Sequence, residues 1–109
     1  MKRRTFEAEL RDGHKGPAVE VPFDPTEAFG VLPVPVETAA YGTIAAHPVH
    51  GAIDGATFDG AIVRRRGKFW ILVDDELRRA AKADVGDVVK VNVAPRATRT
   101  SARQTRASN

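Results

Sequence analysis

The sequence predicts a small, mainly β protein, a barrel or sandwich of short strands with two short helices. Three observations lead to this prediction. Apolar and polar residues alternate over several short stretches, Gly and Pro clusters interrupt these stretches often, and two segments carry helix-start signals. With 109 residues and 11.8 kDa, the chain has the length of one domain.

The first two strands are indicated by alternation. Residues 6–11 place Phe, Ala and Leu between charged residues, which is typical of a strand with one face in water. The turn-forming residues 12–17 separate it from a second alternating stretch, residues 19–23. Pro22 lacks an N–H donor, so we expect this second strand to lie at an edge or to end there.

Each of the two helices has a recognisable start. Asp24 is a good N-cap, Pro25 suits the first helical position, Glu27 completes a capping-box pattern, and Gly30 ends the helix after one to two turns. In the second helix, the acids at 74–76 cap and stabilise the N-terminus. Its apolar stripe is formed by Leu77, Ala80 and Ala81.

The middle of the chain predicts further strands. Residues 31–53 contain enough Pro and Gly to suggest two or three short strands. Asp54-Gly55 is the strongest hairpin signal, because both positions of such a turn need positive φ. Gly60, inside the returning strand 58–64, suggests a bulge or a close backbone approach.

Two more turns and two more strands follow. Residues 65–68 form a turn, and the apolar run 69–73 predicts a strand covered on both faces. Gly86-Asp87 is interpreted as a structural turn, as is Asp54-Gly55. The alternation in 89–93 predicts the final strand.

The domain is expected at residues 5–94, followed by a basic, disordered tail at 95–109 that has no apolar periodicity. Residues 5–94 contain ten of the 17 Lys and Arg residues and all 14 Asp and Glu residues, so the domain itself is mildly acidic. The high isoelectric point therefore comes from the two ends. The tail contributes Arg96, Arg99, Arg103 and Arg106.

Composition excludes several classes of protein. The chain has no cysteine, which removes disulfides, thiolate catalysis and cysteine-based metal sites. Its longest uncharged stretch, residues 38–53, is too short and too polar to span a bilayer. The basic residues 1–4 lead into the polar stretch 5–9, not into an apolar signal segment. We expect a cytoplasmic protein with no cofactor and no membrane partner.

An ordered series of short motifs resembles the bacterial domain of unknown function 1905 family. The motifs run across residues 5–94. They consist of Phe6, Ala8, Leu10; Val21, Pro22, Phe23; Glu27, Phe29, Gly30; Val49, Gly51, Ile53, Asp54, Gly55, Phe58; Leu77, Arg78, Ala80; and Val85, Gly86, Asp87, Val89, Val91.

The resemblance implies a small double-split β-barrel (pseudobarrel) and supplies no established catalytic residues. The end of the domain also resembles the swapped-hairpin barrels of antitoxin and transition-state regulators. The chain departs from the family pattern in the long segment 31–50, where residues 37–47 are either an insertion or a rearranged strand.

The main candidate binding site is a basic cluster next to two aromatic residues. Arg64, Arg65, Arg66 and Lys68 precede Trp70, and guanidinium groups beside an indole can hold a phosphate, a carboxylate or a base. Alternation in a strand places Arg65 on the face opposite Arg64 and Arg66. The competing interpretation is a solvated hairpin tip whose charges discourage edge pairing.

Histidines offer a weaker candidate. His47 and His50, with Asp54 or Asp59, have ligand-type side chains, but positions three apart in a strand point to opposite faces, so we expect no metal site. A hydrolase or isomerase that uses His14, His50 or Asp59 is the third functional hypothesis, and no spacing supports it.

The leading hypothesis is a non-enzymatic β-barrel that binds a small anionic ligand or a protein partner through the Arg64–Trp70 segment. The alternative is a DNA-associated protein that uses basic termini and a dimeric, swapped-hairpin-like barrel, with weak, non-specific phosphate contacts from the tail.

Overall fold

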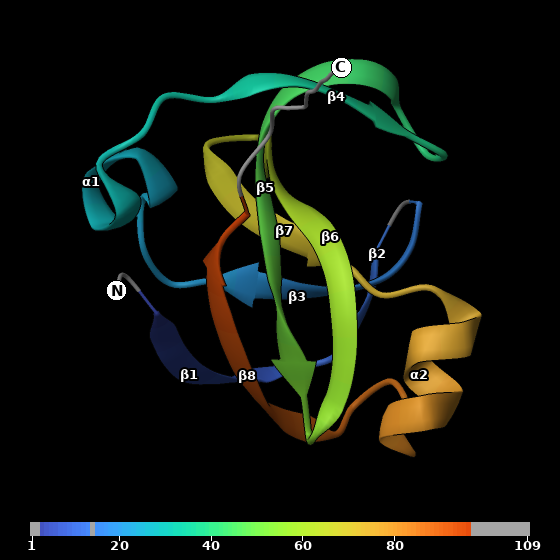
Figure 1. Cartoon of the computed structure of the whole chain (residues 1–109). Coiled ribbons are helices and arrows are strands. Elements are labelled where there is room, and N and C mark those ends of the chain that lie inside the picture. Colours follow the sequence, from blue (N-terminus) through green and yellow to red (C-terminus); the bar gives the residue numbers. More distant parts are fainter. Residues whose placement is uncertain (1–2, 14, 97–109) are drawn as a thin grey trace, which may run out of the picture.

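The computed structural model describes residues 3–13 and 15–96, and in these residues eight strands and two short helices are found (Figure 1). The mainly β prediction is confirmed. The strands are β1 (Arg4–Glu9), β2 (Arg11–Gly13), β3 (Gly16–Val21), β4 (Val34–Thr38), β5 (Gly42–Ile53), β6 (Ala56–Arg65), β7 (Lys68–Leu72) and β8 (Val88–Pro95), and the helices are α1 (Pro25–Phe29) and α2 (Asp75–Ala81).

The strands form one antiparallel sheet in the order β1-β8-β5-β6-β7-β3-β2, with β4 paired to β5 beside this path. The sheet curls into a half-barrel, with α1 and α2 on opposite sides of it (Figure 1). The double-split arrangement stays a prediction from the resemblance.

One residue, Leu10, connects the two ends of the sheet. β1 and β2 are consecutive in the chain but stand at opposite ends of the strand order, so the sheet must curl to bring them together. Leu10 is fully buried, its N–H donates to the carbonyl of Asp87, and its carbonyl accepts from the N–H of Gly86. The Gly86-Asp87 turn, with Gly86 at φ 102°, therefore holds the closure point as well as reversing the chain.

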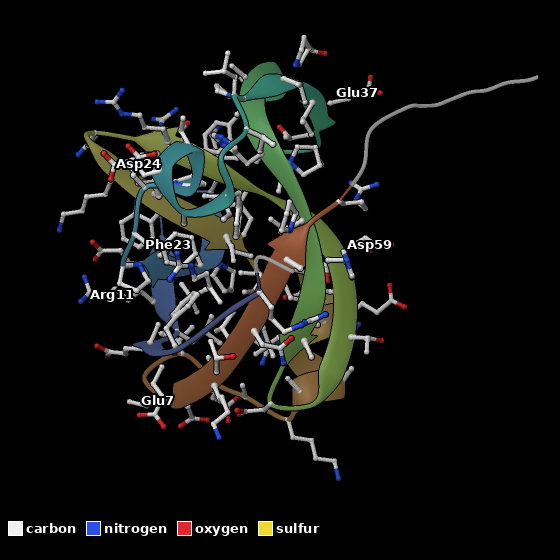
Figure 2. The ribbon with its side chains drawn as sticks, turned by 60° about the vertical axis from the view of Figure 1, so that its left-hand side comes forward. Glu7, Arg11, Phe23, Asp24, Glu37 and Asp59 are labelled. Atoms are coloured by element: carbon white, nitrogen blue, oxygen red, sulfur yellow. The ribbon has the colours of Figure 1, made fainter. Side chains whose placement is uncertain are left out.

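Three aromatic rings pack together across β1, the segment after β3, and α1. The ring centres of Phe6 and Phe23 are 5.8 Å apart, and those of Phe23 and Phe29 are 5.7 Å apart. Both pairs pack edge to face. Figure 2 shows Phe23 between α1 and β1, while Glu7 and Arg11 point outward. β3 ends at Val21, directly before the proline, as predicted.

The predicted N-caps and the glycine that ends α1 are confirmed, but among the described residues Glu27 makes no hydrogen bond back to Asp24, so the capping box is incomplete. The Asp24 carboxylate accepts from the N–H of Thr26, and Gly30 ends α1 at φ 71°. The Asp74 carboxylate accepts from the N–H of Leu77 at the start of α2. Leu77 belongs to the core cluster, which explains why so short a helix is stable here.

Residues 31–53 form β4 and one long strand, β5, of 12 residues. On the side away from β6, β5 pairs first with β4, from Gly42 to Ala46, and then with β8, from Val49 to Ile53. Pro48 falls in the gap between these two partners, where its missing N–H removes no ladder bond. The expectation of separate short strands is therefore wrong in part, because the proline was treated as an interruption.

The apolar run 69–73 is not covered on both faces, which corrects the prediction. Ile71 and Val73 are buried in the core, whereas Trp70 and Leu72 are half-buried on the outer face. The outer face of β7 is therefore partly open to solvent.

The Asp54-Gly55 turn has positive φ at both positions, 47° and 86°, as predicted. Asp54 also does more than turn the chain. Its N–H donates to the carbonyl of Lys90, and its carboxylate accepts from the N–H of Lys90, both at 2.8 Å. The turn is thus bonded to β8 by two bonds to Lys90, with the Asp54 carboxylate in the place that a backbone carbonyl takes in a strand pair.

Two glycines of this hairpin differ from the prediction. Gly60 pairs regularly with Val49, so it forms no bulge, and its only close neighbour is the ring of Phe58. The close backbone approach occurs instead at Gly51, where an added Cβ would lie 1.8 Å from the carbonyl oxygen of Asn92 on β8. No helix among the described residues is long and apolar enough to cross a membrane.

We predict that Asp54→Ala lowers the free energy of unfolding by about 1–2 kcal/mol, because it removes the acceptor for Lys90 and puts a methyl side chain at positive φ. Asp54→Asn keeps an acceptor oxygen and tolerates positive φ, so it should cost less than about 0.5 kcal/mol. Thermal unfolding followed by circular dichroism measures both. Equal destabilisation by the two variants would contradict the role of the carboxylate oxygen.

We predict that Gly51→Ala prevents folding or destabilises the domain by more than about 3 kcal/mol, because backbone atoms of β8 would have to move. Gly60→Ala is the matched control, since only the flexible Phe58 ring lies near and can shift. Its cost should stay below about 1 kcal/mol. Urea unfolding of both variants tests the prediction, which fails if Gly51→Ala unfolds like the parent chain.

Candidate functional site

A pocket of about 480 Å³ lies on the outer face of β3 and β7, and three turns contribute residues to it. These are the β2–β3 turn, the β4–β5 turn and the β6–β7 turn. Figure 1 shows the first two turns on the same side of the molecule. The residues around the pocket are Gly13, Lys15, Gly16, Ala18, Tyr41, Arg65, Arg66, Lys68, Trp70 and Leu72.

The β6–β7 turn supplies most of the charge. Arg66 and Gly67 are its two central residues, with φ of 53° and 77°, which is the backbone of a type I′ turn. Arg65 and Lys68 flank the turn and face each other in register. All three basic side chains are exposed, so their charges remain available to a ligand.

Tyr41, from the β4–β5 turn, also lines the pocket. The guanidinium carbon of Arg65 lies 4.6 Å from the centre of the Tyr41 ring, which is a cation–π contact. This contact holds one arginine in place and connects two hairpins that are distant in the sequence.

The floor of the pocket is apolar. Trp70 and Leu72 are two residues apart on β7 and therefore share a face, and both are half-buried. Ala18 faces Leu72 across the β3–β7 pair. Trp70 therefore lies on the less buried side of its strand, as predicted.

One carboxylate lies near the pocket. Glu20 is the cross-strand partner of Trp70, and its carboxylate is 3.8 Å from the Lys68 ammonium. Both groups are partly exposed, so this ion pair adds no more than about 1 kcal/mol to the stability of the fold. The Glu20 carboxylate also lowers the net positive charge around Lys68.

Arg64 is separated from the rest of the predicted cluster. It lines a second, smaller cavity of about 280 Å³ on the other face of β6, next to His47, Thr26 and Phe69. Alternation separates Arg64 from Arg65 as expected, but Arg66, which alternation alone groups with Arg64, lies with Arg65. The reason is the turn, whose left-handed backbone ends the alternation of β6.

The second cavity contains a Thr26–His47 contact that resembles a nucleophile and its base. The Thr26 hydroxyl lies 3.2 Å from Nε2 of the buried His47, but the same nitrogen lies 3.1 Å from the carbonyl oxygen of Val31. A carbonyl can only accept, so Nε2 carries the proton and cannot take one from Thr26. His47 therefore holds the segment between α1 and β4 in place.

Of the remaining polar candidates, His50 and Asp59 lie together and line a third, open pocket, whereas His47 lies apart from them. His50 is exposed and pairs across the ladder with Asp59, which points away from the barrel (Figure 2). His47 is buried on the other face of β5. Within residues 3–13 and 15–96, no three His, Asp or Glu side chains are grouped as metal ligands. His14 lies outside the described residues, and so does the tail after Arg96.

A family model for a domain of unknown function, DUF1905, matches residues 6–93 of the chain. The chain belongs to the DUF1905 family. No curated protein matches it. The family assignment agrees with the motifs found in the sequence of this DUF1905 domain.

Sequence reasoning found four of the ten residues that line the pocket and missed the other six. Two of the missed residues, Lys15 and Tyr41, have side chains suited to ligand recognition, and each lies in a turn far from the basic cluster in the chain. Neither turn carries a motif that would connect it to β7. Tyr41 is the only tyrosine, and this was the single available signal.

We predict that iodide quenches the fluorescence of this DUF1905 domain more strongly than caesium does. Trp70 is the only tryptophan, and the nearby Lys15, Arg65 and Lys68 raise the local concentration of anions. The ratio of the two Stern–Volmer constants, normalised to free N-acetyltryptophanamide, should exceed about two and should fall with added salt. Equal normalised quenching would contradict the electropositive pocket.

Proposed function

We propose that this DUF1905 domain is a non-enzymatic binding module that takes a small anionic ligand in the pocket between its three turns. The proposal is carried by one observation: four basic side chains and no carboxylate line a pocket whose floor is apolar. Basic groups recognise the charge of the ligand, and the apolar floor supplies contact area.

The location of the charge supports the proposal. Residues 5–94 are acidic overall, with ten basic against 14 acidic side chains, yet the pocket gathers Lys15, Arg65, Arg66 and Lys68. A cluster of this kind does not follow from the general composition of the domain. Because the charges surround a concave surface, their fields add there and attract anions.

The backbone at Arg66 supports it further. The first position of a type I′ turn favours Asn, Asp or Gly, as at Asp54, but the β6–β7 turn has arginine there at φ 53°. A long side chain in this conformation costs about 1 kcal/mol. Strain of this kind is common at binding sites, where the side chain is needed at that position.

The size of the pocket favours a small molecule over a protein chain. Its volume of about 480 Å³ falls within the range typical of small-molecule sites. The pocket also takes its residues from three separate turns, an arrangement that suits a compact ligand better than an extended chain.

We predict that citrate and pyrophosphate at millimolar concentration raise the melting temperature of the domain, and that Arg65→Ala and Arg66→Gly reduce this effect. Each variant should weaken anion binding by about 1–2 kcal/mol, or about 5- to 30-fold. Arg66→Gly removes the charge and suits the turn, so it should not destabilise the fold. Differential scanning fluorimetry and isothermal titration calorimetry provide the two readouts.

Arg64→Ala is the matched control, because it removes the same charge one residue away on the opposite face of β6. Its anion affinity should remain within about twofold of the parent. Glu20→Gln should act in the opposite direction and strengthen binding, since it frees Lys68 from its ion pair. If Arg64→Ala and Arg65→Ala weaken binding equally, the pocket is not the anion site.

A further inference from the structure

We infer that the ligand of this pocket is a flat aromatic anion, with one anionic group at one end of a planar apolar body. The inference rests on the proposed function and adds the chemical class of the ligand. Its starting point is the order of residues along one face of β7. Lys68, Trp70 and Leu72 follow one another there, so a cation, an indole and an aliphatic side chain form a row.

This row sets the shape of the ligand. The four residue steps from Lys68 to Leu72 span about 13 Å in an extended strand, which sets the length of this row. The cations of the β6–β7 turn surround one end. At the other end, Ala18 faces Leu72, and Gly13 and Gly16 flank Lys15 in the β2–β3 turn. Lys15 is exposed, so its ammonium group can stay in solvent, and the half-buried Leu72 supplies the apolar surface at this end.

An inorganic anion fits only half of this arrangement. Phosphate or sulfate bound to Arg65, Arg66 and Lys68 would leave Trp70 and Leu72 in contact with water. A ligand with an apolar body would cover both, and the removal of apolar surface from water favours its binding.

The walls favour a planar body over a flexible one. The indole of Trp70 and the ring of Tyr41 are flat, and the guanidinium of Arg65 already lies over Tyr41 at 4.6 Å. Planar groups stack on guanidinium and indole surfaces with little loss of conformational freedom, unlike an alkyl chain.

The experiment compares four probes on the full chain by isothermal titration calorimetry. They are 1-naphthyl phosphate, n-hexyl phosphate, inorganic phosphate and the neutral 1-naphthalenemethanol. We expect 1-naphthyl phosphate to bind about tenfold or more tightly than each of the other three, because it alone has both a planar body and the anionic group. It should also quench Trp70 fluorescence on stacking.

Variants of Trp70 provide the matched controls. Trp70→Leu keeps an apolar floor but loses the flat surface, so it should weaken 1-naphthyl phosphate binding about tenfold and leave inorganic phosphate binding unchanged. Trp70→Phe should restore most of the loss. Arg66→Gly, which suits its turn, should weaken all three phosphates together and so remains informative if a Trp70 variant does not fold.

The outcomes separate the two proposals. Equal affinity for 1-naphthyl and n-hexyl phosphate, with both weakened by Arg65→Ala, would overturn the aromatic class and keep the anion site. Equal affinity for 1-naphthyl phosphate and 1-naphthalenemethanol would overturn the anionic class of the ligand. If none of the three phosphates binds, the proposed function itself is overturned.

Discussion

The chain passes from one end of its sheet to the other through a single buried residue, Leu10, and the rest of the architecture depends on this passage. The backbone of Leu10 exchanges two hydrogen bonds with the Gly86-Asp87 turn, so the strand order can be satisfied only by a curled sheet. Curling buries one face against itself and leaves the other face outside. The proposed site is on that outer face, at the pocket floored by Trp70 and Leu72.

Hairpin turns carry both the stability and the chemistry of this domain, and they do so by different means. Asp54 and Gly55 suit their left-handed backbone, and Asp54 adds two bonds to β8. Arg66 does not suit its turn, yet it occupies the same kind of position. Positive charge at a hairpin tip also discourages edge pairing. That role alone would be served by any exposed cation and does not explain the grouping with Lys15 and Tyr41.

Alternation along strands decides which neighbours in the sequence act together. Arg64 and Arg65 are adjacent, yet they lie on opposite faces of β6 and line different cavities. His47 and His50 are separated in the same way on β5, one buried and one exposed. Since a side chain on one face cannot assist a side chain on the other, a cluster read from the sequence divides into separate sites.

The sequence by itself determined the β class, both helix caps, the Asp54-Gly55 turn and the family, because these depend on local backbone preferences and short-range periodicity. It also placed Arg65 and Trp70 in a candidate site. Only the tertiary structure decided that β5 continues through Pro48, that Gly51 meets β8, and that Tyr41 and Lys15 complete the pocket. These features depend on contacts between distant segments, and no local pattern records which turns the curl of the sheet brings together.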